Sequence, residues 1–292
     1  MIRTLYRHRS GTIIVNFPDD QLPTAAKDPQ SRLWIDMQSP TDDEYTHVLC
    51  DLFHFHPLAI DDAINDVHVP KVDDYGNYLY LVFHTFRLGE ERMDIETREM
   101  DIFLGPNYLI TLHNHTSPNI EKMWQEDYHR RRGLARGTAM LLYELLDRQL
   151  DSYLPLLDQF EDRVEELGDI IFSKSDRNEN ELLDEILTAK TSALRLRRIL
   201  WPQREAHNRL VRTDYSAIPS DSRIYFQDVF VHGLRLCVMV ESMRDLVIST
   251  MSTYLGITYN RLIEIMKLLA MISTVFIPLG FLAAVFGMYF RY

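Results

Sequence analysis

The pattern of hydrophobic and polar positions divides the chain into three regions. Up to about residue 120, short apolar runs alternate with turn residues, and runs of this length and composition predict β-strands. They lie at residues 11–17, 32–37, 78–88, 98–105 and 107–115. Residues 41–66 are typical of a helix instead, because Thr41 can act as its N-cap and Glu44 follows three positions later. Helices and strands mixed in this way predict an α/β domain with a mixed sheet.

Beyond about residue 138, apolar positions recur every three or four residues, which predicts long amphipathic helices. One covers residues 138–172 and the next residues 179–212. A third begins near residue 221 and runs without a break into the apolar C-terminal stretch. At a rise of about 1.5 Å per residue this helix would be roughly 100 Å long, which exceeds the size of one globular core. We therefore expect a stalk that is bundled with further copies of the same chain.

The C-terminal stretch from Leu268 to Phe290 carries no charged residue. A helix needs about 20 apolar residues to cross the hydrocarbon core of a bilayer. The alternative is a buried helix of a soluble core, but such helices rarely stay apolar on every face for so long. The chain therefore divides into an expected α/β domain over residues 1–135, a stalk over 136–265 and a transmembrane helix over 266–290.

Charge and cysteine content narrow the choice of partners and compartment. The 292 residues carry a formal net charge of −12 at pH 7. This balance is compatible with cations and argues against nucleic acid, because phosphate binding needs a basic face. The two cysteines, Cys50 and Cys237, make no disulfide framework and fit a reducing compartment. The first residues contain no apolar signal segment, so we expect the N-terminal domain in the cytoplasm.

Three segments, in the correct order along the chain, resemble the CorA family of divalent-cation channels, which transport magnesium. They are HPLAIDDAINDVHVPKVDDYGNYLYLVF (56–83), YFQDVFVHGLRLCVMVESMRDLV (225–247) and MKLLAMISTVFIPLGFLAAVFGM (266–288). The resemblance implies a homopentamer in the inner or plasma membrane, in contact with lipid. Each subunit would combine a cytosolic α/β/α domain with long stalk helices, an α+β fold overall, and the last helix would continue into the pore. Family members have a second membrane helix after an acidic loop; this sequence reaches Tyr292 before either, so we interpret it as shortened.

The resemblance also implies regulatory Mg²⁺ sites between neighbouring subunits, where the bound ion holds the pore closed. Aligned residue by residue, their ligands fall on Asp61, Asp62, Asp147 and Asp228. Mg²⁺ keeps several waters and needs only one or two direct carboxylates, so an intersubunit site of this kind is reasonable. Carboxylates that face one another repel when empty, and bound Mg²⁺ would favour a symmetric closed state. The alternative for each aspartate is an ordinary surface or capping residue.

The pore segment matches the family less well. The family hallmark Gly-Met-Asn corresponds to Gly287, Met288 and Tyr289 in this chain. A phenol ring therefore stands where an amide is expected, and five such rings would block a constriction or change what it accepts. Asn260, Met266 and Leu269 do match the family, and the last two could form an apolar gate. The alternative for the gate pair is plain packing or lipid contact.

Other functions have less support from the sequence. We find no set of catalytic residues, so we expect a transport protein and not an enzyme. Two alternatives stay open: a zinc-transporting relative in the same superfamily, and a cytosolic ion-sensing oligomer that conducts nothing. The pairs His54 with His56 and His113 with His115 are weaker metal candidates. Residues two apart share a face only on a strand, and the first pair falls in a predicted helix.

Overall fold

The computed structural model describes residues 1–289 apart from 66–68, 90–92, 131–132 and 174–178, and gives only the backbone of 127–130, 288 and 289. Its N-terminal part is built on a seven-stranded sheet with the strand order β2-β1-β3-β7-β6-β5-β4. The strands are β1 (Ile2–Arg7), β2 (Ile13–Val15), β3 (Arg32–Gln38), β4 (Lys71–Asp74), β5 (Leu79–Leu88), β6 (Ile95–Leu104) and β7 (Tyr108–His113). Strands β3 and β7 pair in parallel and the other neighbours pair antiparallel, which confirms the predicted mixed sheet.

The hydrophobic pattern of the sequence does not predict two of the strands. β1 mixes charged and apolar residues, and β4 is the short polar stretch Lys71–Asp74. Both form because a longer neighbour offers its free edge: β1 pairs along all of its length with β3, and β4 pairs with the start of β5. The pairing supplies the backbone hydrogen bonds of these two strands, so they form although their local sequence does not predict them.

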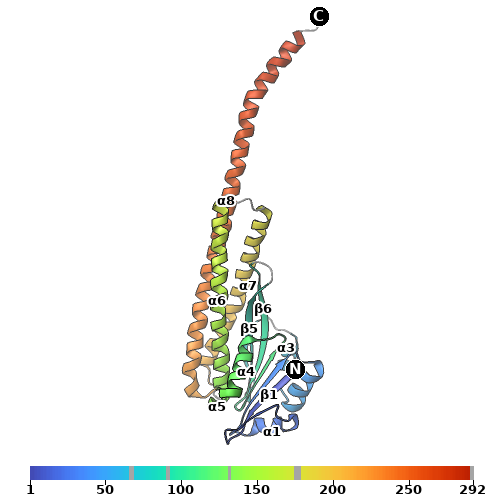
Figure 1. The fold of residues 1–292 in the computed structure, drawn as a ribbon, viewed down its shortest axis with the longest axis vertical. Helices are drawn as coiled ribbons and strands as arrows, with labels where there is room; N and C mark the ends of the chain where they lie inside the picture. Colours follow the sequence, from blue (N-terminus) through green and yellow to red (C-terminus); the bar gives the residue numbers. More distant parts are fainter. Residues whose placement is uncertain (66–68, 90–92, 131–132, 174–178, 290–292) are drawn as a thin grey trace.

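Helices cover both faces of the sheet (Figure 1). On one face lie α1 (Leu22–Lys27), α2 (Asp42–Tyr45), a π-helical segment (Thr46–Leu52) and α3 (Pro57–Ile64). The other face is covered by α4 (Pro118–Arg130), α5 (Gly133–Arg136), α6 (Thr138–Phe172) and α7 (Glu179–Arg212), and α8 (Arg223–Tyr289) packs on these. Short 3-10 turns occupy Asp19–Gln21 and Ser220–Ser222. Strand β7 is buried on both sides because Leu109 faces the α6–α8 core and Ile110 faces the α1–α3 core.

The single helix expected over residues 41–66 is wrong in part. Its beginning is confirmed, because Thr41 and Glu44 form a reciprocal capping box. The helix then widens into the π-helical segment and breaks before α3. Pro57 lacks a backbone N–H and forces the preceding His56 into an extended conformation, with ψ at 135°. His54 lies in this break with a positive φ of 53°.

The long helices are confirmed with the predicted bounds. α6 and α7 form a hairpin, and the first part of α8 lies against both. Buried side chains recur along α8 as far as Val247 and Thr250, and from residue 258 onward nearly every residue is exposed. Figure 1 shows this last part of α8 extending alone, far past the end of the hairpin. The sequence is apolar here, so the exposed segment needs another environment than water.

The turn between β6 and β7 provides a test of the packing. A Cβ added to Gly105 would lie 2.3 Å from the ring of Tyr108, which is 9% exposed and packs on Phe53. Gly105→Ala is therefore expected to destabilise the domain by about 1–3 kcal/mol, seen as a lower midpoint of thermal unfolding in detergent. Gly168→Ala is the control, because nothing lies within 4 Å of its added Cβ. Alanine in that helix should stabilise by roughly 0.5–1 kcal/mol. Equal stability of the two variants would contradict this packing.

His207 on α7 gives the fold a defined sensitivity to acid. The side chain is 1% exposed, stacks on Phe83 at 5.1 Å, and neither ring nitrogen has a hydrogen-bond partner among the described residues. Burial lowers the pKa of His207 to about 3. The unfolded chain therefore takes up a proton below about pH 6.5, and stability falls as the pH drops toward the folded pKa. At pH 5 the loss is about 2 kcal/mol. His207→Leu should flatten the pH dependence of thermal unfolding between pH 7 and 5; an unchanged slope would contradict the burial of a neutral ring.

Candidate metal site at the base of the stalk

Two predicted ligand positions and a histidine come together on two helices near the sheet end of the stalk. Asp147 lies on α6, and Asp228 and His232 lie one turn apart on α8. His232 Nδ1 is 3.5 Å from Asp147 Oδ1, and its Nε2 is 3.8 Å from Asp228 Oδ1. Two of the four predicted ligand positions are thus neighbours within one subunit. The imidazole of His232 between them was not among the predicted ligands.

A fourth residue completes this cluster. Ligand atoms of Asp147, Asp151 and His232 all lie within 4.8 Å of one another, close enough to hold one metal ion. Sequence reasoning missed Asp151, although its position four residues after Asp147 places both carboxylates on one helix face. Asp151 is exposed, whereas Asp147 and His232 are half-buried. Ions from solvent, or side chains of a second subunit, can therefore reach the cluster.

The electrostatics of the cluster favour a cation. Burial raises the pKa of Asp147, and the charges of Asp151 and Asp228 raise it further, while His232 acts in the opposite direction. Three carboxylates near one half-buried position repel one another, and a bound divalent cation would remove that repulsion. Carboxylate oxygens suit Mg²⁺, and the imidazole nitrogen adds a donor that transition metals prefer.

Asp61 and Asp62 lie elsewhere in the subunit, on α3 beyond the other face of the sheet. Asp61 accepts a hydrogen bond from Asn65 at 2.9 Å. Asp62 accepts from Lys71 on β4 at 2.5 Å, and the same ammonium group is 2.7 Å from Asp73. Burial lowers the pKa of Lys71, but the bonds to both carboxylates outweigh burial and raise it overall, so this lysine stays charged. The structure of one subunit therefore does not join α3 to the α6–α8 cluster.

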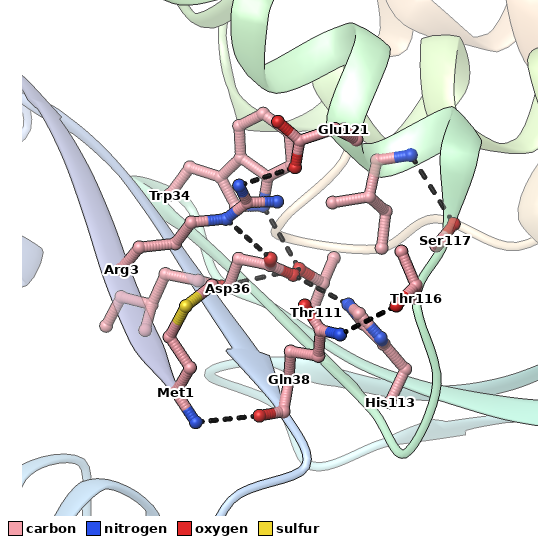
Figure 2. A network of polar contacts seen from close by, with 12 residues as sticks. Met1, Arg3, Trp34, Asp36, Gln38, Thr111, His113, Thr116, Ser117 and Glu121 are labelled. Carbon is pink, nitrogen blue, oxygen red and sulfur yellow. Dashed lines mark hydrogen bonds and ion pairs between the residues drawn. The ribbon is translucent and has the colours of Figure 1, made fainter.

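The weaker histidine candidates serve other purposes. His54 lies in the break before α3, where its Nδ1 is 2.7 Å from the carbonyl oxygen of Cys50, and His56 Nδ1 caps α3 by accepting from Leu58. The expectation of a helix at residues 54–56 is therefore wrong, because Pro57 interrupts it. His113 belongs to a polar network that joins the sheet to α4, as Figure 2 shows.

Asp36 is the centre of that network. Its carboxylate accepts from Thr111 Oγ1 at 2.6 Å and from Arg3 Nε at 2.9 Å, and His113 Nε2 lies 3.1 Å away (Figure 2). Arg3 also donates to Glu121 at 2.7 Å. Burial alone would raise the pKa of Asp36, but the bonds from His113 and Thr111 and the charge of Arg3 lower it overall. The network holds β1, β3, β7 and α4 together and leaves His113 engaged.

Comparison with known proteins identifies the relationship. The sequence model of the family described as "CorA-like Mg2+ transporter protein" matches residues 29–292. The chain is 36% identical over 259 residues to YfjQ of Bacillus subtilis (strain 168), which is named as a proposed metal ion transporter; the match covers 89% of this chain and 79% of YfjQ. It is 28% identical over 281 residues to the cobalt/magnesium transport protein CorA of Thermotoga maritima, covering 96% of this chain and 76% of that protein. This chain belongs to the CorA family.

The fold agrees with this membership. The structure of the CorA magnesium transporter from Methanocaldococcus jannaschii superposes with a TM-score of 0.80 at 22% identity, covering 99% of this chain and 88% of that one. The N-terminal α/β/α domain, the long helices and the final apolar helix are thus a CorA architecture. The cytoplasmic domain of ZntB from Vibrio parahaemolyticus shares the fold, with a TM-score of 0.65 at 15% identity.

As a CorA-family protein, the chain resides in the plasma membrane and carries a soluble N-terminal domain. Among the described residues one helix, α8, is long and apolar enough to span a bilayer. An 18-residue window of it has a mean hydropathy of 2.3, and none of that window is buried. The gate candidates Met266 and Leu269 lie on this exposed part, 56% and 65% exposed. Asn260 and Gly287 are exposed on it too, while the side chains of Met288 and Tyr289 lie outside the described part.

Proposed function

We propose that this CorA-family protein transports Mg²⁺ across the membrane and is closed by Mg²⁺ that binds to its cytoplasmic stalk. The observation that carries the proposal is the cluster of Asp147, Asp151, Asp228 and His232. Two of its members sit on α8, the helix that continues into the apolar span. A site on that helix can act on the pore without any further connecting element.

Self-association is supported by an apolar seam along α8. Large hydrophobic side chains that are exposed in the single subunit recur at steps of three and four residues over 231–238 and 255–269, with Ile248 in the same register between these stretches, where Glu241, Asp245 and Ser252 take the other positions of the series. The hydrophobic side chains are Val231, Leu234, Val238, Ile248, Leu255, Tyr259, Leu262, Met266 and Leu269. A seam at this spacing is typical of helices that pack in parallel around a common axis. A homopentamer, as the family resemblance implies, would bury the seam and place Met266 and Leu269 near the pore axis.

The proposed gating follows from charge. Empty carboxylate clusters repel one another, and Mg²⁺ bound between Asp61 or Asp62 of one subunit and Asp228 of the next would pull the subunits together. Because Mg²⁺ then binds the closed state more tightly, it shifts the population toward closure. The signal travels along α8 from His232 to the apolar segment, about 50 Å at 1.5 Å per residue. A continuous helix can carry such a displacement to Met266 and Leu269.

A second cation class is favoured by one observation. His232 lies between Asp147 and Asp228, and imidazole suits Co²⁺, Ni²⁺ or Zn²⁺ better than Mg²⁺. Tyr289 in place of the family asparagine separates this chain from the usual Mg²⁺ selectivity sequence. Transport of a transition-metal ion is therefore the alternative cargo, and an oligomer that senses ions without conducting them is the alternative function.

Uptake measurements test the proposal. The full-length protein, expressed in cells that lack their own Mg²⁺ transporters, should restore growth at low Mg²⁺ and raise Mg²⁺ influx above that of Zn²⁺. Zn²⁺ influx alone would favour the transition-metal alternative. Mg²⁺ binding to the purified oligomer without any ion flux in proteoliposomes would contradict transport and support an ion sensor.

A further inference from the structure

Lys71 on β4 binds one of the aspartates that the proposed function assigns to Mg²⁺. Its ammonium nitrogen lies 2.5 Å from Asp62 Oδ2 and 2.7 Å from Asp73 Oδ2. The side chains of Lys71, Asp62 and Asp73 are 25%, 33% and 37% exposed. Because all three are more than half covered, water weakens the contact less than it weakens an ion pair on the open surface.

An aromatic ring beside Lys71 also favours its positive charge. Its ammonium lies 5.1 Å from the centre of the Tyr80 ring, and a phenol face attracts a cation. The hydroxyl of Tyr80 donates to Asp101 at 2.6 Å, and that carboxylate is 3% exposed. Lys71 therefore sits where Asp62, Asp73 and the ring face of Tyr80 all favour a positive charge. A free cation that approaches Asp62 therefore finds this carboxylate already paired with the Lys71 ammonium group.

We propose that Lys71 is a built-in counter-ion that competes with Mg²⁺ for Asp62 and so sets the Mg²⁺ concentration at which the regulatory sites fill. This inference rests on the proposed function, because Asp62 is a Mg²⁺ ligand only there. Two cations a few ångströms apart repel strongly, so Mg²⁺ bound at Asp62 displaces the ammonium. Asp73 receives it, since Lys71 already contacts Asp73 and keeps a partner there. The competition lowers Mg²⁺ affinity and prevents closure at low Mg²⁺.

The competing explanation is structural. Lys71 joins β4 to α3 and could serve only to hold that edge strand against the helix. In that case its removal lowers thermal stability and leaves Mg²⁺ affinity at Asp62 unchanged or weaker. Mg²⁺ affinity, and its dependence on Asp62, separates the two roles.

The test is calorimetric titration of Mg²⁺ into the full-length protein in detergent. Lys71→Gln is expected to lower the Mg²⁺ dissociation constant roughly three- to tenfold, the range that loss of a partly covered ion pair allows. Lys71→Arg keeps the charge and should bind as the wild type does. Lys190→Gln is the matched control, because Lys190 is an exposed lysine on α7. Lys71→Met keeps the apolar stem and is the second variant if glutamine prevents folding.

Asp62→Asn separates the possible failures. Combined with Lys71→Gln it should abolish the gain in affinity. A gain in affinity that persists in the double variant would overturn the inference. So would the absence of a gain in both Lys71→Gln and Lys71→Met while Asp62→Asn alone weakens binding. In these cases the assignment of the regulatory site would stand. If Asp62→Asn alone leaves Mg²⁺ binding unchanged, the assignment of Asp62 itself is wrong, and the role of Lys71 is wrong with it.

Discussion

Aspartate in place of Val238 is expected to convert the assembled protein into separate subunits. Val238 is 64% exposed in the single subunit and lies in the apolar seam of α8. In a parallel bundle around one axis, every copy would bring a new carboxylate to the same level, where the charges are buried and repel one another. Burying an unpaired charge costs several kcal/mol, enough to weaken association by a hundredfold or more.

Light scattering of the protein in detergent should show a fall in molecular mass from that of the proposed pentamer to that of one chain. Leu194→Asp provides the control, because Leu194 is 45% exposed on α7, outside the seam, and should leave the mass unchanged. An unchanged mass for Val238→Asp would mean that α8 does not line the axis of the assembly.

Neutralising Asp147 and Asp228 together is expected to weaken Mg²⁺ binding at the stalk by roughly tenfold or more. Loss of supporting groups around a metal commonly costs 10–100-fold in affinity, and direct ligands cost at least as much. Mg²⁺ is expected to protect the stalk helices of the wild type against limited proteolysis, and this protection should be lost in the Asp147→Asn/Asp228→Asn variant.

Asp158→Asn is the matched control, since Asp158 is exposed on α6 and outside the cluster. If the double variant keeps full Mg²⁺ protection, the ion acts elsewhere, and the cluster is a solvated acidic patch.

The sequence predicts the helical part well because its signals are long and periodic. The bounds 138–172 and 179–212 agree with α6 and α7, and the apolar run from Leu268 marks the span in α8. The α/β part is less predictable: β4 depends on pairing with β5, and the break before α3 depends on Pro57 overriding a helical pattern. Strand pairing depends on residues that are far apart in the sequence, so a local pattern does not predict it.

The candidate site was predictable in part for a similar reason. Family resemblance points to Asp147 and Asp228, but only the packing of α6 on α8 brings His232 between them and adds Asp151. Likewise, no spacing rule connects Lys71 with Asp62, because α3 and β4 meet only through the fold. The intersubunit character of the Mg²⁺ sites stays a prediction, since it depends on contacts between copies.

The most direct test is the flux of divalent cations through the full-length protein while Mg²⁺ is varied on the cytoplasmic face alone. We predict that current in excised membrane patches falls as cytoplasmic Mg²⁺ rises. In Asp147→Asn/Asp228→Asn the midpoint should move to higher Mg²⁺ by about the factor lost in binding affinity. A current that does not depend on cytoplasmic Mg²⁺, or an unchanged midpoint in the double variant, would contradict closure by Mg²⁺ at the stalk.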